Sequence, residues 1–302
     1  MLEITDKQKN AWTLACLAAP VLHTASCLYW LDVLWVSLLC TGVRAWIAEK
    51  KVQARIPWLL SFIAVAAAAQ ALHTIKDSWP TQRDLEWIMM ILLILAVLQA
   101  GKGEKASICG GILLWWLTAF LLGSVLVSGV TKVKISQWYR KSMERDWKAI
   151  FRLMTLLLIP CLLEKEKKRA ELELFLLPVL CALIIQGILP MAIWTGSKAP
   201  FYEISRSIRL YGMLERMEAM AWLGLMLGTY LYFSFLMTIT GGKEEKKERR
   251  IFMLLISAAA AICAARFLHE EILLAANLFG FIILVVLSVC IKWAVKRKER
   301  KM

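Results

Sequence analysis

The chain has 302 residues, of which 60% are hydrophobic, and its mean hydropathy is +0.61. Soluble globular proteins use about 45–50% apolar residues, so this composition excludes an ordinary soluble domain. The 37 basic and 23 acidic residues give a formal net charge of +14 at pH 7. We attribute this charge to membrane topology and expect no nucleic-acid binding, which would need a basic face on a soluble domain.

Ten apolar segments follow a short polar lead. Each is long enough to cross about 30 Å of hydrocarbon as a helix, although the fourth, sixth and ninth are marginal. Because they lack the alternating pattern of membrane β-strands, the sequence predicts an all-α integral membrane protein with a single domain over residues 1–302. The predicted spans are residues 10–30, 31–47, 57–74, 85–100, 107–129, 147–163, 172–194, 214–239, 251–267 and 272–295.

The positions of the basic residues predict how the spans are oriented. With the N-terminus inside, 23 of the 37 basic residues lie on the cytoplasmic side, as the positive-inside rule requires, and both termini are cytoplasmic. The spans also divide into five over residues 10–129 and five over residues 147–295. Halves with an odd number of spans have opposite orientations, so the sequence predicts a 5+5 inverted-repeat, LeuT-like transporter fold.

The first span of each half carries a proline, which marks a candidate binding site. Pro20 lies near the middle of span one, and Pro160 lies in the short span six. Proline removes a backbone donor and frees carbonyl groups, and inverted-repeat transporters bind ligands at interrupted helices. An ordinary proline kink is the alternative, and His23 is equally suited to an interhelical hydrogen bond. The candidate ligand-binding residues are Pro20, His23, Thr24, Ser26 and Pro160.

Several features within the spans argue against cofactor chemistry. All eight cysteines lie in apolar segments without a CxxC pair, so we expect no metal, disulfide or other cofactor. No catalytic motif is present, and we expect no enzyme activity.

Arg152 and Arg266 lie near the ends of spans six and nine, and we expect their side chains to reach toward the lipid headgroups.

Span eight begins with three charges directly before about twenty apolar residues. Glu215 and Glu218 are three residues apart and share one helical face, with Arg216 turned about 100° away. They form either a gate or structural ion pair, or an acidic helix start stabilised by the helix dipole.

Farther along, Gly224 and Gly228 form a GxxxG pattern that predicts close helix packing, inside the bundle or between subunits. Two alanine runs are interpreted in the same way, residues 66–69 and 258–261.

The same region carries a family resemblance. The segments Tyr202-Glu-Ile-Ser-Arg-Ser-Ile-Arg209 and Leu214-Glu-Arg-Met-Glu-Ala-Met-Ala-Trp222 resemble the start of the eighth helix of the GerAB family. These proteins are the membrane-spanning B subunits of bacterial spore germinant receptors, within the amino acid–polyamine–organocation transporter superfamily. Weaker similarities to the family lie in Ile4–Gln8, Asp32–Trp35 and Glu164–Arg169.

The resemblance implies a membrane subunit of a spore germinant receptor, located in the spore inner membrane. Such a subunit would sense a small nutrient, such as an amino acid, in a cavity between spans one, three, six and eight, and would trigger germination. The implied partners are an A-type subunit, which is a membrane protein with a soluble domain, and a C-type subunit, which is a lipoprotein.

Two other functions stay open. The chain departs from the family pattern because it has no glycine before Gly42 and none between Gly129 and Gly187. Glycine lets backbone approach a ligand closely, so its absence near both prolines is compatible with a structural subunit that binds no ligand. An ion-coupled amino acid permease is the other alternative, and gradient-driven uptake would distinguish it from a receptor.

Overall fold

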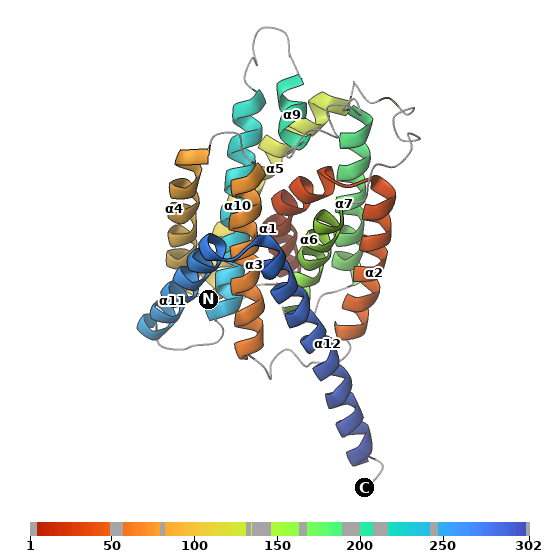
Figure 1. Cartoon of the computed structure of the whole chain (residues 1–302), viewed down its shortest axis with the longest axis vertical. Coiled ribbons are helices and arrows are strands. Elements are labelled where there is room, and N and C mark those ends of the chain that lie inside the picture. The colour runs from red at the N-terminus through yellow and green to blue at the C-terminus, as the bar shows by residue number, and fades with distance from the viewer. Residues whose placement is uncertain are drawn as a thin grey trace.

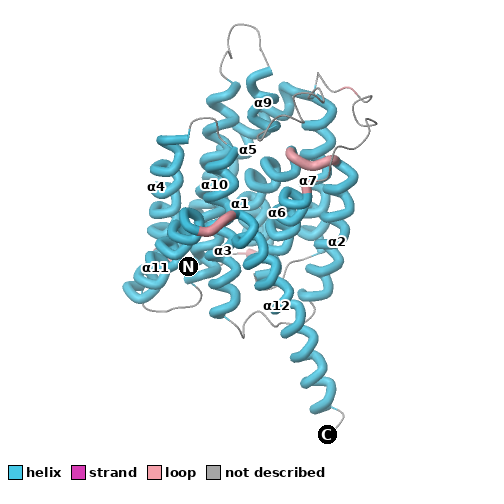
Figure 2. Tube along the Cα trace, in the orientation of Figure 1, coloured by secondary structure: helices cyan, strands magenta, loops and turns pink. Residues whose placement is uncertain are grey.

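The computed structural model describes residues 5–48, 57–78, 82–130, 134, 146–162, 168–188, 200–207, 217–241 and 247–299. Within these ranges the chain is helical and has no strand (Figures 1 and 2). The predicted all-α class is therefore confirmed for the described part of the chain.

The helices follow the predicted spans closely. The first half forms α1 (Asp6–Ser26), α2 (Trp30–Ala48), α3 (Pro57–Ser78), α4 (Gln82–Gly101) and α5 (Glu104–Val130). The second half forms α6 (Trp147–Leu158), the 3₁₀ helix η3 (Ile159–Leu162), α7 (Lys168–Ile188), α9 (Pro200–Ser207), α10 (Met217–Gly241), α11 (Lys247–Phe267) and α12 (Glu270–Glu299). Each of the ten predicted spans thus contains a helix, although residue 163 of span six, residues 189–194 of span seven and residues 214–216 of span eight lie outside the described residues.

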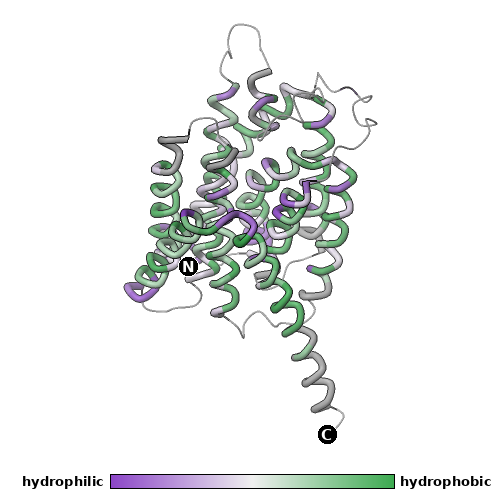
Figure 3. The backbone as a smooth tube through the Cα atoms, in the orientation of Figure 1, coloured by the Kyte–Doolittle hydropathy of each residue, from purple (hydrophilic) through white to green (hydrophobic). Residues whose placement is uncertain are grey.

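Five of the described helices are long and apolar enough to cross a membrane. The qualifying stretches are Trp58–Ile75, Glu104–Gly129, Met217–Gly241, Lys247–Phe267 and Glu270–Leu287, and the shorter apolar stretches are Trp87–Gly101 and Phe175–Ile188. Figure 3 shows hydrophobic residues along most of the helical length. By the length and composition of these helices the chain is a multi-pass membrane protein, whereas ten spans in an inverted repeat remain a prediction.

Helix α10 lies at the centre of the bundle, where it contacts α1, α3, α4, α5, α9 and α11 (Figure 1). A Cβ added to Gly228 would lie 2.1 Å from Cβ of Ala19 in α1, and one added to Gly224 would lie 2.8 Å from a methyl carbon of Leu122 in α5. Only glycine permits these approaches. The GxxxG pattern therefore serves packing inside the bundle, which confirms that interpretation.

The segment that carries the family resemblance is described in part. Helix α9 holds Phe201 and Ile204 fully buried, and it packs against α1, α5, α7 and α10. The resemblance continues through residues 208–216, which lie outside the described residues, and into the first turns of α10. Helix α9 is thus an integral part of the bundle.

One end of the bundle gathers basic residues. Lys9 in α1 forms an ion pair with Glu104 at the start of α5, with 2.9 Å between Nζ and Oε1. Gly101, at the end of α4, lies against Ile251 in the first turns of α11. The starts of α1, α5 and α11 therefore share one end, called the basic end below. Its basic residues in the described part of the chain are Lys7, Lys9, Lys102, Lys105, Lys247, Arg249 and Arg250.

Candidate ligand-binding site

A cavity of about 50 Å³ lies between α1, α3, α6 and α10. These helices occupy predicted spans one, three, six and eight, so the cavity lies where the family resemblance placed it. One water molecule needs roughly 10–15 Å³ of such space, so the cavity has room for a few waters or a small ligand. Its polar lining residues are His23, Thr24, Gln70, Thr74, Arg152, Thr155, Thr229 and Tyr232. Its apolar lining residues are Ala19, Pro20, Ala67, Ala71, Ile75, Leu156, Leu225 and Met226.

Three of the five predicted ligand-binding residues line this cavity. Pro20, His23 and Thr24 face it from the last two turns of α1. Ser26 is fully buried outside the lining, and its hydroxyl donates to the carbonyl of His23 at 2.6 Å. Pro160 is also buried and outside the lining. The structure thus brings the α1 residues together at the cavity, while their binding role stays a prediction.

The expected interruption of span one is absent from the structure. Helix α1 continues from Asp6 to Ser26 through Pro20. Proline inside a helix removes one backbone hydrogen bond, but the helix survives where its surroundings hold it. Here α5, α6, α7 and α10 all pack against α1. Its contribution to the cavity therefore comes from side chains rather than from unwound backbone.

Span six does change its winding beside Pro160, where α6 gives way to η3. In a 3₁₀ turn the N–H of residue 160 would bond the carbonyl of Leu157, but proline has no N–H. Arg44 of α2 donates to that carbonyl instead, with 2.8 Å between Nη1 and the oxygen. Arg44 is only 2% exposed. Arg44 therefore supplies the hydrogen bond that Pro160 cannot make.

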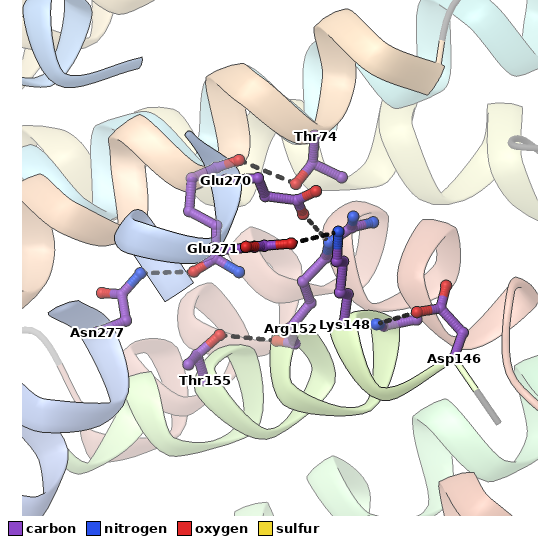
Figure 4. A network of polar contacts seen from close by, with 10 residues as sticks. Thr74, Asp146, Lys148, Arg152, Thr155, Glu270, Glu271 and Asn277 are labelled. Atoms are coloured by element: carbon purple, nitrogen blue, oxygen red, sulfur yellow. Dashed lines mark hydrogen bonds and ion pairs between the residues drawn. The ribbon is translucent and has the colours of Figure 1, made fainter. Parts of the chain in front are cut away.

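Two ion pairs join the starts of α6 and α12 beside the cavity (Figure 4). Lys148 pairs with Glu271 at 2.8 Å, and both side chains are largely exposed, at 53% and 71%. One turn farther along α6, Nε of Arg152 pairs with Oε1 of Glu270, and these side chains are only 18% and 12% exposed. Arg152 therefore does not reach for the headgroups as expected, because a carboxylate from α12 lies closer.

A buried amide pair links α12 to the cavity wall. The Nδ2 group of Asn277 donates to Oε1 of Gln70 at 2.5 Å, and Asn277 is fully buried (Figure 4). Polar side chains inside membrane helices are costly unless they are paired, so this bond fixes α12 against α3. Sequence reasoning missed both residues, although an isolated amide within an apolar span was the available signal.

Tyr232 contributes an unused hydroxyl to the cavity. Its side chain is 1% exposed and lines the cavity from α10. Within the described residues no hydrogen bond is found for its hydroxyl. The neighbouring Thr229 hydroxyl donates to the carbonyl of Leu225 at 2.8 Å and so is already satisfied. None of the lining residues that the structure describes is acidic. The cavity thus offers hydrogen-bond donors and one cation, a combination that suits a carboxylate.

The predicted charge cluster at the start of span eight is described only in part. Glu218 lies half-buried in the first turn of α10, whereas Glu215 and Arg216 lie outside the described residues.

Among the residues that the structure describes, no group of three His, Cys, Asp or Glu side chains is placed to hold a metal ion. Comparison of the chain with protein-family models and with curated proteins gave no match.

Proposed function

We propose that the chain is a membrane subunit of a spore germinant receptor that binds a small amino acid between α1, α3, α6 and α10. The observation that supports this proposal most strongly is the cavity itself. It lies between the four helices that the resemblance to the GerAB family implies, and it combines a cation with an unused hydroxyl and methyl-lined walls. Such a lining fits the carboxylate and the short side chain of a small amino acid.

The arrangement of charge supports access from outside the membrane. Basic residues concentrate on the cytoplasmic side of membrane proteins, so we assign the basic end to the cytoplasm, together with both termini. The α1 residues of the cavity belong to the last two turns of that helix, whereas α1 begins at the basic end. The cavity therefore lies in the half of the bundle that faces the exterior, from which a nutrient arrives.

The proposal includes the ten-span inverted repeat. Helices α1 and α6 are the first helices of the two halves, and both line the cavity, as expected where repeats meet at a binding site. Binding of an amino acid would stabilise one conformation of the bundle, provided that its affinity differs between two conformations. The A-type and C-type receptor subunits would transmit this change from the spore inner membrane.

Germination of spores that lack the gene tests this function. We expect the deletion strain to lose its response to one or a few small amino acids in a panel of single amino acids and sugars. Wild-type protein should restore that response, and Ala71→Trp, which fills the cavity, should not. Ala259→Trp is the matched control, because Ala259 is exposed on α11.

Two outcomes would contradict the proposal. An unchanged response of the deletion strain to every nutrient would exclude a receptor role. Restoration by Ala71→Trp as complete as by Ala259→Trp would exclude the cavity as the sensing site. Gradient-driven amino acid uptake into vesicles would favour the permease instead.

A further inference from the structure

The guanidinium of Arg152 has spare donor capacity at the cavity. An arginine carries five N–H donors, and Arg152 uses Nε for its ion pair with Glu270. Within the described part of the chain the guanidinium makes no other hydrogen bond or ion pair. Its side chain is 18% exposed and lines the cavity. The remaining N–H groups are therefore available to a carboxylate that enters the cavity.

Three positions of α6 form a series that leads into the cavity. Lys148, Arg152 and Thr155 are three or four residues apart, so they share one face of the helix. The pair at Lys148 is exposed, the pair at Arg152 is mostly buried, and Thr155 lines the cavity beyond it. Figure 4 shows both basic side chains extending from α6 toward the two glutamates of α12. Arg152 thus lies where the exposed surface gives way to the cavity.

Glu270 belongs to α12, and none of the described side chains of α12 lines the cavity. The described residues that line it all come from α1, α3, α6 and α10. Glu270 can therefore leave Arg152 without opening the walls, while Asn277 keeps α12 bound to α3. A released Glu270 carboxylate would remain stabilised, because it lies in the first turn of α12, where the helix dipole favours negative charge, and within electrostatic reach of Lys148.

We propose that Arg152 binds the carboxylate of the ligand and that Glu270 occupies the same guanidinium while the cavity is empty. Binding then exchanges one carboxylate for another on Arg152. A buried arginine left without a partner is costly, and the exchange avoids that state. The displaced Glu270 moves with the first turn of α12, so occupancy of the cavity is transmitted to α12. This inference rests on the proposed function and names the group that the ligand must carry.

Binding of three small amino acids to the purified chain in lipid nanodiscs tests the exchange. The probes are glycine, L-alanine and L-serine, each compared with its carboxamide, which lacks the negative charge. Glu270→Gln removes the charge that competes for Arg152, so amino acid affinity should rise about tenfold. Carboxamide affinity should change by less than about twofold. Glu271→Gln is the matched control on the neighbouring exposed pair, and it should change both affinities by less than about twofold.

A second variant protects the test against misfolding. Arg152→Gln leaves Glu270 without its partner, so the double variant Arg152→Gln with Glu270→Gln is used, and thermal unfolding checks that it is folded. We expect it to bind amino acids and carboxamides equally.

Two further results would overturn the exchange. Wild-type binding of an amino acid that Glu270→Gln does not tighten would exclude it, while leaving the proposed cavity and function intact. A double variant that still prefers the carboxylate would exclude Arg152 as its partner. Absence of binding of every probe, in the wild type and in Glu270→Gln alike, would overturn both proposals.

Discussion

Helices α10 and α11 are neighbours in sequence and both are apolar enough to cross a membrane, yet they occupy opposite environments. In the membrane-spanning stretch of α10, 67% of the residues are buried inside the protein, against 17% in the corresponding stretch of α11. Hydropathy therefore predicts that a helix enters the membrane but not whether it meets protein or lipid there. The two helices also differ in the spacing of their small residues.

The buried helix places its small residues on one face. Ala221, Gly224 and Gly228 recur at intervals of three and four residues and let α1 and α5 approach. The alanine run of α11 instead occupies consecutive positions that point in different directions. Ala258 is buried, but Ala259 is exposed, and large side chains such as Phe252 and Ile256 also face outward.

The largest effect in this comparison is expected at the closest helix approach. Gly228→Ala places a Cβ 2.1 Å from Cβ of Ala19, so α1 and α10 must separate. We expect a loss of about 1–3 kcal/mol in unfolding free energy, measured by thermal unfolding in detergent. Gly123→Ala is the control, because its Cβ would meet no atom within 4 Å, and it should stabilise the helix by about 0.5–1 kcal/mol. Equal stabilisation by both substitutions would contradict the packing of α10.

A smaller contrast is expected within α11 itself. Ala258→Leu forces extra atoms into a buried position and should cost about 1 kcal/mol or more. Ala259→Leu adds the same atoms to an exposed position and should change stability by less than about 0.5 kcal/mol. The same thermal unfolding assay measures both. A loss at Ala259 as large as that at Ala258 would mean that the outward face of α11 is covered by protein.

The smallest effect on stability is expected at the cavity wall of α10. Tyr232→Phe removes a hydroxyl for which no hydrogen bond is found within the described residues, so the free energy of unfolding without ligand should shift by less than about 0.5 kcal/mol. If that hydroxyl donates to the ligand, amino acid affinity should fall about two- to tenfold, as for a single hydrogen bond. Titration of Tyr232→Phe with L-alanine measures this loss. Unchanged affinity with unchanged stability would remove Tyr232 from the site.

Features set by local pattern could be predicted from the sequence. Apolar length predicted the positions of the helices, and the GxxxG spacing indicated close packing of α10. Pro20, His23 and Thr24, which were predicted together as ligand-binding residues, line one cavity, and their binding role stays a prediction. The alanine run 66–69 is buried throughout, as predicted, whereas only the first and last residues of run 258–261 are buried.

Features set by pairing between distant segments could not be predicted. Gln70 and Asn277 are 207 positions apart, and Arg152 meets Glu270 only because α6 and α12 begin side by side. A single sequence contains no signal for such pairs. The role of Arg44 was missed for the same reason, since its partner is a carbonyl of another helix. The ion pair of Arg152 and the amide pair beside the cavity therefore come from contacts between distant helices, which the periodicity of one sequence does not indicate.

The most direct test of the account is binding of radiolabelled glycine, L-alanine and L-serine to the purified chain in nanodiscs, for the wild type, Ala71→Trp and Ala259→Trp. Ala71 lines the cavity, and Ala259 is exposed on α11. We predict saturable binding of at least one amino acid to the wild type and to Ala259→Trp, and its loss in folded Ala71→Trp. Binding that survives in Ala71→Trp, or no binding to the wild type, would contradict a ligand site between α1, α3, α6 and α10.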